Sequence, residues 1–538
     1  MGIIGICSYE VIYIKRKVRC VMKGLRKALL ISMMLGVTVL GTVGCINQSS
    51  DSSNDVLKVG AISFAGTLEP TENYFSWAVV RYGVGETLTK FDDHMNAKPW
   101  LASSWKQSDD KLTWTFTIND KIKFSNGNAL TAEAVKASLE RTFTKSKRAK
   151  TFFNYTEMTA NGQELTIKTD KPYYNLPNLL GDPLFLVMDV TAEANGRDIA
   201  KEGPIGTGPY VVTSFTKERA ELARNDNYWD GKPGFAKVEI PSINDANTRA
   251  MALQAGDVDM AVSIGPGEYG IFQNDKKFTI YEESSLRDVF VRMSQKGKLK
   301  NANLRAALIA GADRESYAKN LMKNTFVAGK APLPPSIDYG FNQLRDPNTY
   351  NIERAKELLK KEGYVDTNGD GIVDKNGENL VLNFYAYTSR PELPLYAEAL
   401  QADYKKIGVD LQIKIVDYSV IDTLAQSGDY DMLISSVVTA NTGQPVWFLK
   451  QYWGTGSDTN GSGFSNPRFD ELLALGESAN DPVVRRNAVI NAQQLMLDDS
   501  VALFLGYPKI NIVGNKQIDG IKISPSEYYI ITKDLKRK

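Results

Sequence analysis

The stretch that decides the fold is Gly85–Leu139, GETLTKFDDHMNAKPWLASSWKQSDDKLTWTFTINDKIKFSNGNALTAEAVKASL. Within it, residues 113–118 alternate threonine with tryptophan, phenylalanine and isoleucine. Alternation over this length is typical of a strand that buries one face and exposes the other. We therefore expect a strand at LTWTFTI.

A turn and a helix follow this strand. Ser125–Asn128 supplies residues that tolerate turn dihedrals. Thr131 then precedes an apolar pattern of helical spacing that begins at Ala132, with an acid in its first turn, and this predicts an N-capped amphipathic helix. Upstream, Trp100 and Trp105 carry too much apolar area to stay in water, so we assign both indoles to the core.

Beyond this block the chain alternates strand and helix patterns, which points to α/β layers. The clearest unit is 380–415, where two alternating segments flank a helix of about fifteen residues in a βαβ arrangement. We expect further strands over 56–62, 165–169, 258–262 and 430–435, and helices over 245–254, 305–310, 314–322 and 352–362.

The loop Asp366–Asp374, DTNGDGIVD, has the early ligand spacing of a calcium loop. Its twelfth position is Gly377, where a bidentate glutamate belongs, and Glu378 comes one residue late. An alternating strand pattern follows instead of a helix. We therefore interpret the loop as a turn and not as a calcium site.

The amino terminus carries an export signal. A basic segment, Met22–Lys27, precedes thirteen mostly apolar residues, Ala28–Leu40, and a small-residue cleavage site at Gly44-Cys45. This apolar run is shorter than the roughly 20 residues that a membrane-spanning helix needs. We expect a signal peptide over 1–44, with translation starting at Met1 or at Met22, and a flexible Ser/Asp-rich tether over 45–55.

The chain has three cysteines, Cys7, Cys20 and Cys45, and only Cys45 survives the expected cleavage. A lone cysteine at a processed amino terminus resembles a lipobox, in which the thiol is acylated and holds the protein on the outer face of the membrane. Thr42 departs from the leucine that is usual three positions earlier. The alternative is ordinary secretion with an unpaired thiol.

Length and charge limit the classes of protein. At 538 residues the chain is longer than the length at which a single hydrophobic core stops growing, so we expect two or more lobes. Loss of residues 1–44 would leave 57 basic and 62 acidic residues. This mildly acidic balance argues against nucleic acid as a partner, which requires a clustered basic face.

An enzyme would need chemistry that the sequence does not supply. His94, which we place on a turn, is the single histidine, and the sequence lacks a nucleophile elbow, a phosphate-binding loop and a dinucleotide fingerprint. We therefore expect no catalysis and no cofactor. A carboxylate-dependent hydrolase and a non-transport surface protein remain as alternatives.

Several motifs, in their order and spacing, resemble the extracytoplasmic solute-binding proteins of ABC importers, in particular the peptide/nickel/opine family (bacterial solute-binding protein family 5). The resemblance runs from about Val56 to the C-terminus. The motifs are PWLASSW (99–105), TFTI (115–118), KFSNG (123–127), LTAE (130–133), IGTGPY (205–210), RNDNYW (224–229) and AGDVD (255–259).

This resemblance implies a two-lobed α/β fold of the periplasmic-binding-protein type II, with an enlarged first lobe and a ligand cleft between the lobes. The implied division is a first lobe over 56–284, a second lobe over 285–505 and a return to the first lobe over 506–538. It also implies a monomer that captures a small solute outside the membrane and delivers it to the permease and ATPase subunits of an importer.

Whole-chain resemblance to the nickel-binding branch suggests the residues of the cleft. It places Arg148 at a cleft arginine, Tyr74 or Trp77 near an amino-terminal aromatic, and Phe152 or Phe153 near a cleft tryptophan. Asp182 stands where that branch has a second cleft arginine, and the loop 454–463 lacks its histidine. Both departures argue against direct binding of a nickel ion.

Three solutes remain open: a short peptide, a nickel chelate, and another zwitterion such as an opine. The carboxylates of all three need cations, and we choose Arg148, Arg287 and Arg390 as candidates. Arg390 follows a strand and precedes a helix, the position where α/β lobes hold ligands. Each could instead be an ordinary salt-bridge arginine. Asn441, Gln444 and Trp447 follow another strand and could line the opposite wall.

Overall fold

The computed structural model describes residues 55–62, 66–479 and 481–538. The predicted signal peptide, Cys45 and nearly all of the tether lie outside the described residues, so lipidation stays a prediction. Among the residues described, no helix is both long and apolar enough to cross a bilayer.

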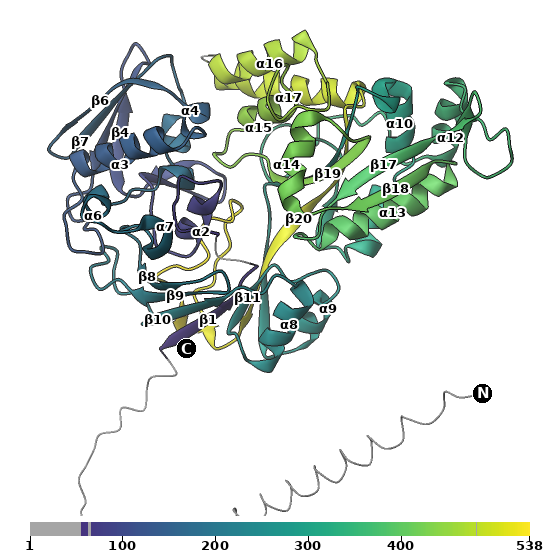
Figure 1. Cartoon of the computed structure of the whole chain (residues 1–538). Helices are drawn as coiled ribbons and strands as arrows, with labels where there is room; N and C mark the ends of the chain where they lie inside the picture. Colours follow the sequence, from purple (N-terminus) through teal and green to yellow (C-terminus); the bar gives the residue numbers. More distant parts are fainter. Residues whose placement is uncertain (1–54, 63–65, 480) are drawn as a thin grey trace, which may run out of the picture. The chain divides into compact units, whose positions relative to one another are not determined.

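A twelve-stranded mixed sheet runs through the described chain. In Figure 1 the strands of this sheet extend from β8 and β10 on one side to β17 and β18 on the other. The strand order is β18 (Asp410–Ile415), β17 (Val381–Ala386), β19 (Met432–Val438), β13 (Arg287–Met293), β20 (Ala502–Asn515), β11 (Met260–Val262), β1 (Val56–Gly60), β10 (Lys237–Pro241), β9 (Arg219–Arg224) and β8 (Tyr210–Phe215). Two further strands, β12 (Phe278–Ser284) and β14 (Phe326–Ala328), pair with β20.

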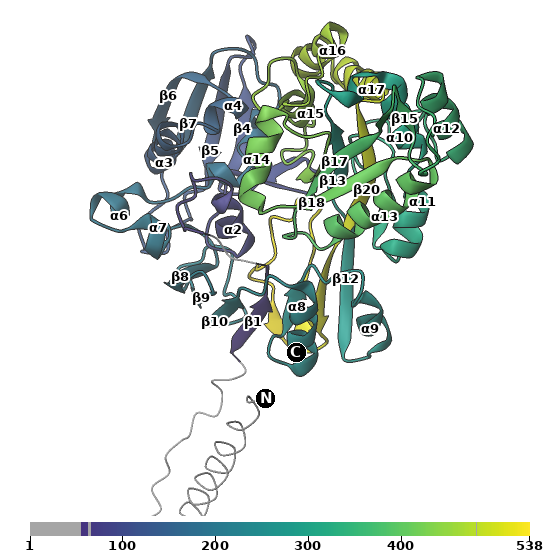
Figure 2. The ribbon, with the colours of Figure 1, turned by 45° about the vertical axis from the view of Figure 1, so that its right-hand side comes forward.

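The long strand β20 joins the two lobes. Its first half pairs with β13, with Gly506 opposite Val289, and its second half pairs with β12, with Lys509 opposite Ser284. The pairing of β12 with β20 can be followed in Figure 2. We use "first lobe" for 56–284 with 506–538 and "second lobe" for 285–505. These boundaries stay a prediction, and the change of partner along β20 supports them.

The block Gly85–Leu139 supplies two strands of a separate four-stranded sheet, which has the order β4 (Ala102–Gln107), β5 (Thr113–Ile118), β7 (Glu164–Thr169) and β6 (Tyr155–Asn161). In β5 the tryptophan, phenylalanine and isoleucine are buried, which confirms the predicted alternation. The predicted helix is α3 (Ala132–Lys145), and Thr131 caps it because its Oγ1 accepts the amide of Ala134 at 3.2 Å.

Trp100 and Trp105, which we assigned to the core, are only half buried. Trp105 in β4 lies against the core of this sheet and contacts Phe116, and Trp100 meets Tyr529 edge to face with ring centroids 5.5 Å apart. The prediction of core packing therefore holds in part for Trp105, whereas Trp100 packs on the C-terminal segment outside that core.

The second lobe contains the predicted βαβ unit. β17 and β18 are parallel neighbours, and α13 (Glu392–Lys406) connects them. The helix predicted over 314–322 is instead the short α11 (Arg314–Ser316) followed by a π-helical turn, η3 (Tyr317–Leu321). The hydrogen bond here spans five residues instead of four, because the amide of Met322 donates to the carbonyl of Tyr317.

The other helices of the second lobe are α10 (Ala302–Ala310), α12 (Ile352–Lys361), α14 (Tyr418–Ser427), α15 (Val446–Trp453), α16 (Pro467–Ser478), α17 (Pro482–Asp498) and η2 (Lys298–Lys300). The first lobe adds α2 (Phe75–Arg81), α4 (Ala149–Phe152), α5 (Leu176–Leu179), η1 (Pro183–Phe185), α6 (Val190–Ala194), α7 (Ile199–Glu202), α8 (Ala246–Ala255) and α9 (Tyr269–Asn274). Short strand pairs are β2 (Thr89–Phe91) with β3 (Ala97–Pro99), β15 (Asp374–Lys375) with β16 (Glu378–Asn379), and β21 (Ile518–Asp519) with β22 (Lys536–Arg537).

The loop Asp366–Asp374 is a turn held by its own carboxylates. Asp366 accepts the amides of Gly369 and Gly371 at 2.7 and 2.9 Å, and Asp374 accepts the amide and hydroxyl of Thr367. The β15–β16 hairpin follows it where an EF-hand would place a helix. In the part of the chain that the structure describes, no three His, Cys, Asp or Glu side chains gather as a metal site.

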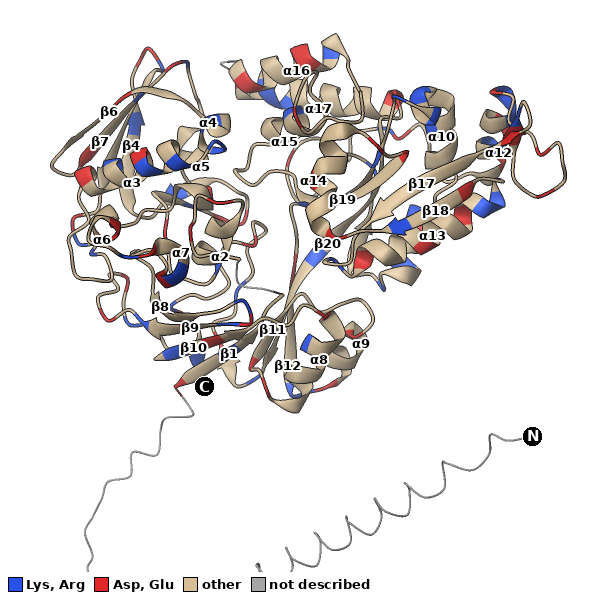
Figure 3. Cartoon of the chain, viewed as in Figure 1, with Lys and Arg blue, Asp and Glu red and all other residues tan. Residues whose placement is uncertain are grey.

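Charged side chains of both signs are interspersed over the helices and loops of both lobes, for example along α3, α12 and α13 (Figure 3). Beneath them, four apolar cores of the described chain lie within one lobe each, three in the first lobe and one in the second. A further core combines Phe91, Met95 and Tyr528 of the first lobe with Phe448 and Trp453 of the second. The lobes therefore share apolar contacts.

Candidate ligand cleft

A cavity of about 1070 Å³ lies between the lobes. Its first-lobe wall comes from 151–179 and its second-lobe wall from 442–485. Three of the predicted site residues, Phe152, Gln444 and Trp447, line it. A cavity of this size is large enough for a small organic solute, since ligand pockets usually enclose roughly 300 to 1,000 Å³.

Arg148 immediately precedes α4, whose Thr151 and Phe152 line this cavity, but Arg148 itself, like Tyr74 and Trp77, is not among the lining residues. Its guanidinium stands over the ring of Tyr74, with 4.2 Å from Cζ to the ring centroid. All three of its nitrogen atoms are buried, and none has a hydrogen-bond partner within the described chain. A buried charge in this state is costly unless an acceptor is supplied, so Arg148 presents a set of unused donors.

Two indoles add to this set of unused donors. The Nε1 atoms of Trp77 in α2 and of Trp447 in α15 are buried and likewise lack an acceptor among the described residues. Trp77 meets Tyr74 edge to face, with centroids 5.5 Å apart, and meets Tyr528 at 5.1 Å. The two indoles come from opposite lobes, and Trp447 also lines the cavity.

The adjacent phenylalanines divide between cleft and core. Phe152 stacks on Trp447 across the lobes, with centroids 5.8 Å apart and an interplanar angle of 15°. Phe153 is fully buried inside the first lobe, against Phe143 and Phe185. The prediction that either residue could line the cleft is therefore corrected for Phe153. The chain leaves α4 in an extended conformation at this residue, which turns neighbouring side chains to opposite sides.

Asp182 and Asn441 link the lobes directly. The Asn441 amide donates to Asp182 at 2.8 Å, and the Asn441 carbonyl accepts the hydroxyl of Tyr528 at 3.1 Å. Burial raises the pKa of Asp182, while the nearby positive charge of Arg148 opposes the rise. The side-chain amide of Asn441 is therefore engaged in the contact between the lobes. Gln444 accepts from the hydroxyl of Tyr339 at 3.2 Å and still faces the cavity.

Comparison with known proteins places the chain in a family. Residues 96–460 match the model of the "Bacterial extracellular solute-binding proteins, family 5 Middle". The chain belongs to this family. It is 27% identical to the nickel-binding protein NikA of Staphylococcus aureus over 505 residues, which cover 93% of this chain and 97% of that protein.

The structure of Staphylococcus aureus NikA in complex with Ni(L-His)2 superposes with a TM-score of 0.79 at 26% identity and covers 90% of this chain and 100% of NikA. The oligopeptide-binding protein AppA of Bacillus subtilis, in complex with a nonapeptide, has the same fold, with a TM-score of 0.76 at 23% identity and coverage of 90% and 99%. These structures confirm the two-lobed α/β fold. Members of the family are solute-binding proteins and not enzymes.

In this family 5 protein, Arg287 is committed to an ion pair. It starts β13, and its Nε and Nη2 lie 3.3 and 3.4 Å from the two carboxylate oxygens of Glu527, while Nη1 donates to the carbonyl of Ser436 at 3.0 Å. Burial raises the pKa of Glu527, but the arginines around it outweigh that effect and bring the pKa to about 2. Arg287 is therefore corrected from a ligand contact to a structural residue whose donors are satisfied.

Arg390 differs from Arg287 although the two are neighbours. It lies in the loop between β17 and α13 and lines a second cavity, of about 290 Å³. Its backbone carbonyl accepts the amide of Leu393 at 3.2 Å, whereas its side chain makes no hydrogen bond or ion pair within the described residues. Burial, and then the charge of Arg287, lower its pKa, with Glu527 acting in the opposite direction.

The sequence did not single out Tyr418, Arg81 or Glu527. Tyr418 begins α14 directly after β18, and the rule that ligands bind at the carboxyl ends of strands could have found it. Burial raises the pKa of its phenol, and Asp422 and Tyr74 add to the rise, so Tyr74 of the first lobe lies within electrostatic reach of this second-lobe residue. Nothing in the sequence marks Arg81 and Glu527 as partners, because 446 positions separate them.

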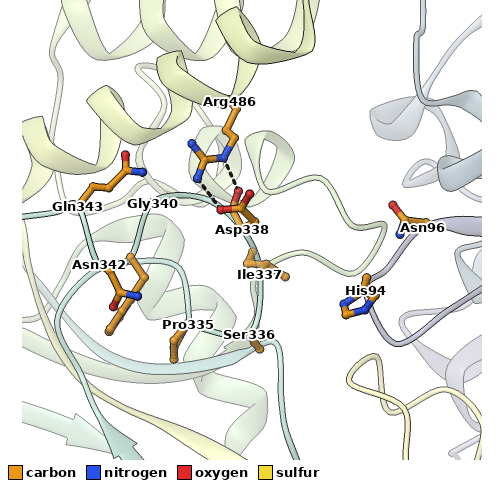
Figure 4. A pocket seen from close by; sticks show the side chains of 11 residues that line it. His94, Asn96, Pro335, Ser336, Ile337, Asp338, Gly340, Asn342, Gln343 and Arg486 are labelled. Carbon is orange, nitrogen blue, oxygen red and sulfur yellow. Dashed lines mark hydrogen bonds and ion pairs between the residues drawn. The ribbon is translucent and has the colours of Figure 1, made fainter.

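His94 lies on the turn between β2 and β3, as predicted. It faces a surface cavity of about 540 Å³ formed with the second-lobe loop 335–343 (Figure 4). Asp338 of that loop already pairs with Arg486 of α17, which also lines the cavity. This cavity therefore offers no unused charge to a solute.

Proposed function

We propose that this protein captures a small solute bearing a carboxylate outside the cell membrane and delivers it to the permease of an ABC importer. The observation that carries the proposal is the buried guanidinium of Arg148, which has three nitrogen atoms without an acceptor in the described chain and directly precedes the cavity-lining residues of α4. A carboxylate is its natural complement, because two oxygens match the guanidinium fork.

The surrounding groups fit the same solute. Trp77 and Trp447 each offer an N–H without an acceptor, and Tyr74 and Phe152 offer aromatic faces for an apolar part. These residues come from both lobes, so a solute held among them stabilises the closed arrangement. Closure excludes water and strengthens the charge-assisted contacts.

Two solutes are favoured, a metal chelate and a short peptide. The 27% identity to a nickel-binding protein over 93% of the chain supports a chelate whose ligands carry the carboxylates. The fold likeness to a peptide-bound protein keeps a peptide as the second candidate, and an opine as a third. A bare nickel ion fits poorly, because the guanidinium of Arg148 repels a cation.

The test is direct binding to the purified chain. Native mass spectrometry identifies any solute that copurifies, and calorimetry then compares nickel–histidine mixtures with a pool of short peptides. Loss of a charge-assisted contact costs roughly 1.5 to 3 kcal/mol, so Arg148→Ala should bind the identified solute about 10- to 150-fold more weakly. Arg345→Ala is the matched control, because the Arg345 side chain is 80% exposed. Equal affinity of wild type and Arg148→Ala would contradict the proposal.

We also propose that the mature chain is anchored through Cys45. Labelling of producing cells with a fatty-acid analogue should mark the wild type and leave Cys45→Ala unlabelled and released from the membrane. If Cys45→Ala were still labelled and membrane-bound, the proposed lipidation of Cys45 would be contradicted.

We propose further that the solute is released unaltered. Long incubation with the protein should return it chemically unchanged, whereas turnover would show that the chain has an enzymatic activity.

A further inference from the structure

Tyr452, one residue before the C-terminal end of α15, has a hydroxyl group that the fold leaves unused. Its ring is held by aromatic neighbours, with ring centroids 5.9 Å from Phe290 and 5.0 Å from Phe448. Its hydroxyl makes no hydrogen bond within the described chain. The preceding residue, Gln451, lines the cavity between the lobes. Tyr452 therefore combines a fixed ring with an unengaged hydroxyl beside this cavity.

The groups that influence this phenol come from both lobes. Burial raises the pKa of Tyr452, and Arg292 opposes the rise. Smaller effects in the same direction as burial come from Tyr74, Tyr418 and Tyr387. Tyr74 belongs to the first lobe, and Tyr74 and Tyr418 are both about half exposed. Since such effects require short separations, the phenol of Tyr452 lies at the junction of the lobes, and its raised pKa keeps it protonated as a donor.

Arg292 of β13 stands against the ring of Tyr452, with 4.4 Å from its Cζ to the ring centroid. The residue is only 5% exposed. Its Nη1 donates to the carbonyl of Thr459 at 2.9 Å, while its Nε is buried and has no acceptor among the described residues. No carboxylate of the described chain pairs with it. The aromatic face of Tyr452 therefore stabilises a buried charge that has no acidic partner.

A cation against the face of a phenol acts on the hydroxyl at the edge of the ring. It favours the withdrawal of electron density from the oxygen, so the O–H group becomes more acidic and a stronger hydrogen-bond donor. The lowering effect of Arg292 on the pKa of Tyr452 has this direction. A carbonyl or carboxylate oxygen that accepts from Tyr452 would therefore be held more strongly than by a phenol without such a cation.

We propose that Tyr452 donates its hydroxyl to an oxygen atom of the bound solute and that Arg292 is a positioning residue that strengthens this hydrogen bond through the ring. The inference rests on the proposed function, because it adds two residues to the same site. It also narrows the class of solute. Arg148 of the first lobe is the proposed partner of a carboxylate, so the solute carries a second acceptor oxygen, a carbonyl or carboxylate, that reaches Tyr452 of the second lobe.

The experiment measures, by calorimetry, the binding of two probes to the purified chain, nickel with two equivalents of histidine and the peptide trialanine. Tyr452→Phe should weaken a bound probe about 3- to 10-fold, through the loss of one hydrogen bond. Arg292→Met should weaken it about 3-fold, and Arg292→Lys, which keeps a cation, should restore most of that loss. Tyr350→Phe, a matched change at a phenol that is 39% exposed, should leave the affinity unchanged.

The double variant separates an action through the phenol from a general structural effect. In the Tyr452→Phe background, Arg292→Met should weaken the probe no further, because the hydroxyl on which Arg292 acts is already absent. If Arg292 only supports the fold, the losses of the two single variants should multiply instead, and Arg292→Lys should bind as weakly as Arg292→Met. Either of these results would overturn the role given to Arg292.

The outcome for Arg148 distinguishes this inference from the proposed function. If Arg148→Ala weakens the probe while Tyr452→Phe binds as tightly as wild type, the site is correct and the contact with Tyr452 is wrong. If Tyr452→Phe weakens the probe and Arg148→Ala does not, the contact with Tyr452 stands and the carrier of the proposed function is wrong. If wild type binds neither probe, the two favoured solutes are excluded, and the inference fails with them.

Discussion

Arg148 and Arg287 are both buried arginines near the junction of the lobes, yet their surroundings are opposite. Arg287 has its donors satisfied by Glu527 and by the carbonyl of Ser436. Arg148 has a ring beneath its guanidinium and no acceptor among the described residues. The first charge is neutralised by the fold, whereas the second requires a partner from outside the chain.

The two arginines should therefore act on different properties, Arg287 on the stability of the fold and Arg148 on the binding of a solute. A buried charge whose partner is in the chain stabilises the fold only as a pair, so removing one member leaves the other uncompensated. A buried charge without a partner costs free energy until a ligand arrives, so its removal should affect binding and spare the fold.

Arg287→Ala should lower the free energy of unfolding by about 3 to 5 kcal/mol, because Glu527 then remains buried with weaker compensation. Urea unfolding of wild type and variant measures the change. Arg287→Ala combined with Glu527→Gln should recover part of the loss. A loss below about 1 kcal/mol would contradict the view that this pair is structural.

Glu86 extends the comparison to a buried carboxylate that has all its partners in the first lobe. Thr207, Tyr228 and Trp229 donate to it at 2.8, 2.9 and 3.0 Å. Burial outweighs these bonds and raises its pKa from 4.5 to about 7. Since the pKa in the folded state is above the ordinary value, the contribution of Glu86 to stability is full below pH 4.5 and is lost as the pH rises through about 7.

The stability that the protein loses through Glu86 between pH 4.5 and about 7 is roughly 3 kcal/mol, at 1.36 kcal/mol per pKa unit. Glu86→Gln should therefore be the less pH-sensitive protein, with the difference from wild type changing by this amount between pH 4.5 and 7. Parallel stability profiles for the two proteins would show that Glu86 does not titrate in this range.

The Phe152–Trp447 stack tests the contact between the lobes that encloses Arg148. A double-mutant cycle with Phe152→Leu and Trp447→Leu should give a coupling of about 0.5 to 1.5 kcal/mol in solute binding. The matched cycle on Phe143 and Phe153, a contact inside the first lobe, should give coupling in unfolding and none in binding. Coupling in binding for the second cycle would mean that Phe153 does contact the solute.

Arg148→Met should change the free energy of unfolding without solute by no more than about 0.5 kcal/mol, because the substitution removes an unpaired buried charge and keeps apolar volume. The same urea titration serves as the measurement. The stabilisation that saturating solute gives to wild type should be lost. A cost of several kcal/mol without solute would place Arg148 beside Arg287 as a structural residue.

Local pattern was sufficient for much of the fold. The buried alternation of β5, the Thr131 cap of α3 and the parallel β17–α13–β18 unit were all predictable, because each depends on residues near one another in sequence. The π-helical turn at Tyr317–Leu321 was not, since the sequence pattern there is that of an ordinary helix. For the cleft, the structure has Phe152 in the wall of the cavity between the lobes, whereas a part for Arg148 in binding stays a prediction.

Motifs and local pattern were enough to identify the family, the α/β class and the arginines and aromatics from which a cleft could be built. Which of these arginines has unused donors depends on contacts between distant parts of the chain. Glu527 accepts hydrogen bonds from Arg287, although 240 positions separate the two residues. Asp182, the carboxylate near Arg148, instead accepts a hydrogen bond from Asn441, 259 positions away. Such partners are chosen by the packing of the two lobes, and no local pattern encodes that choice.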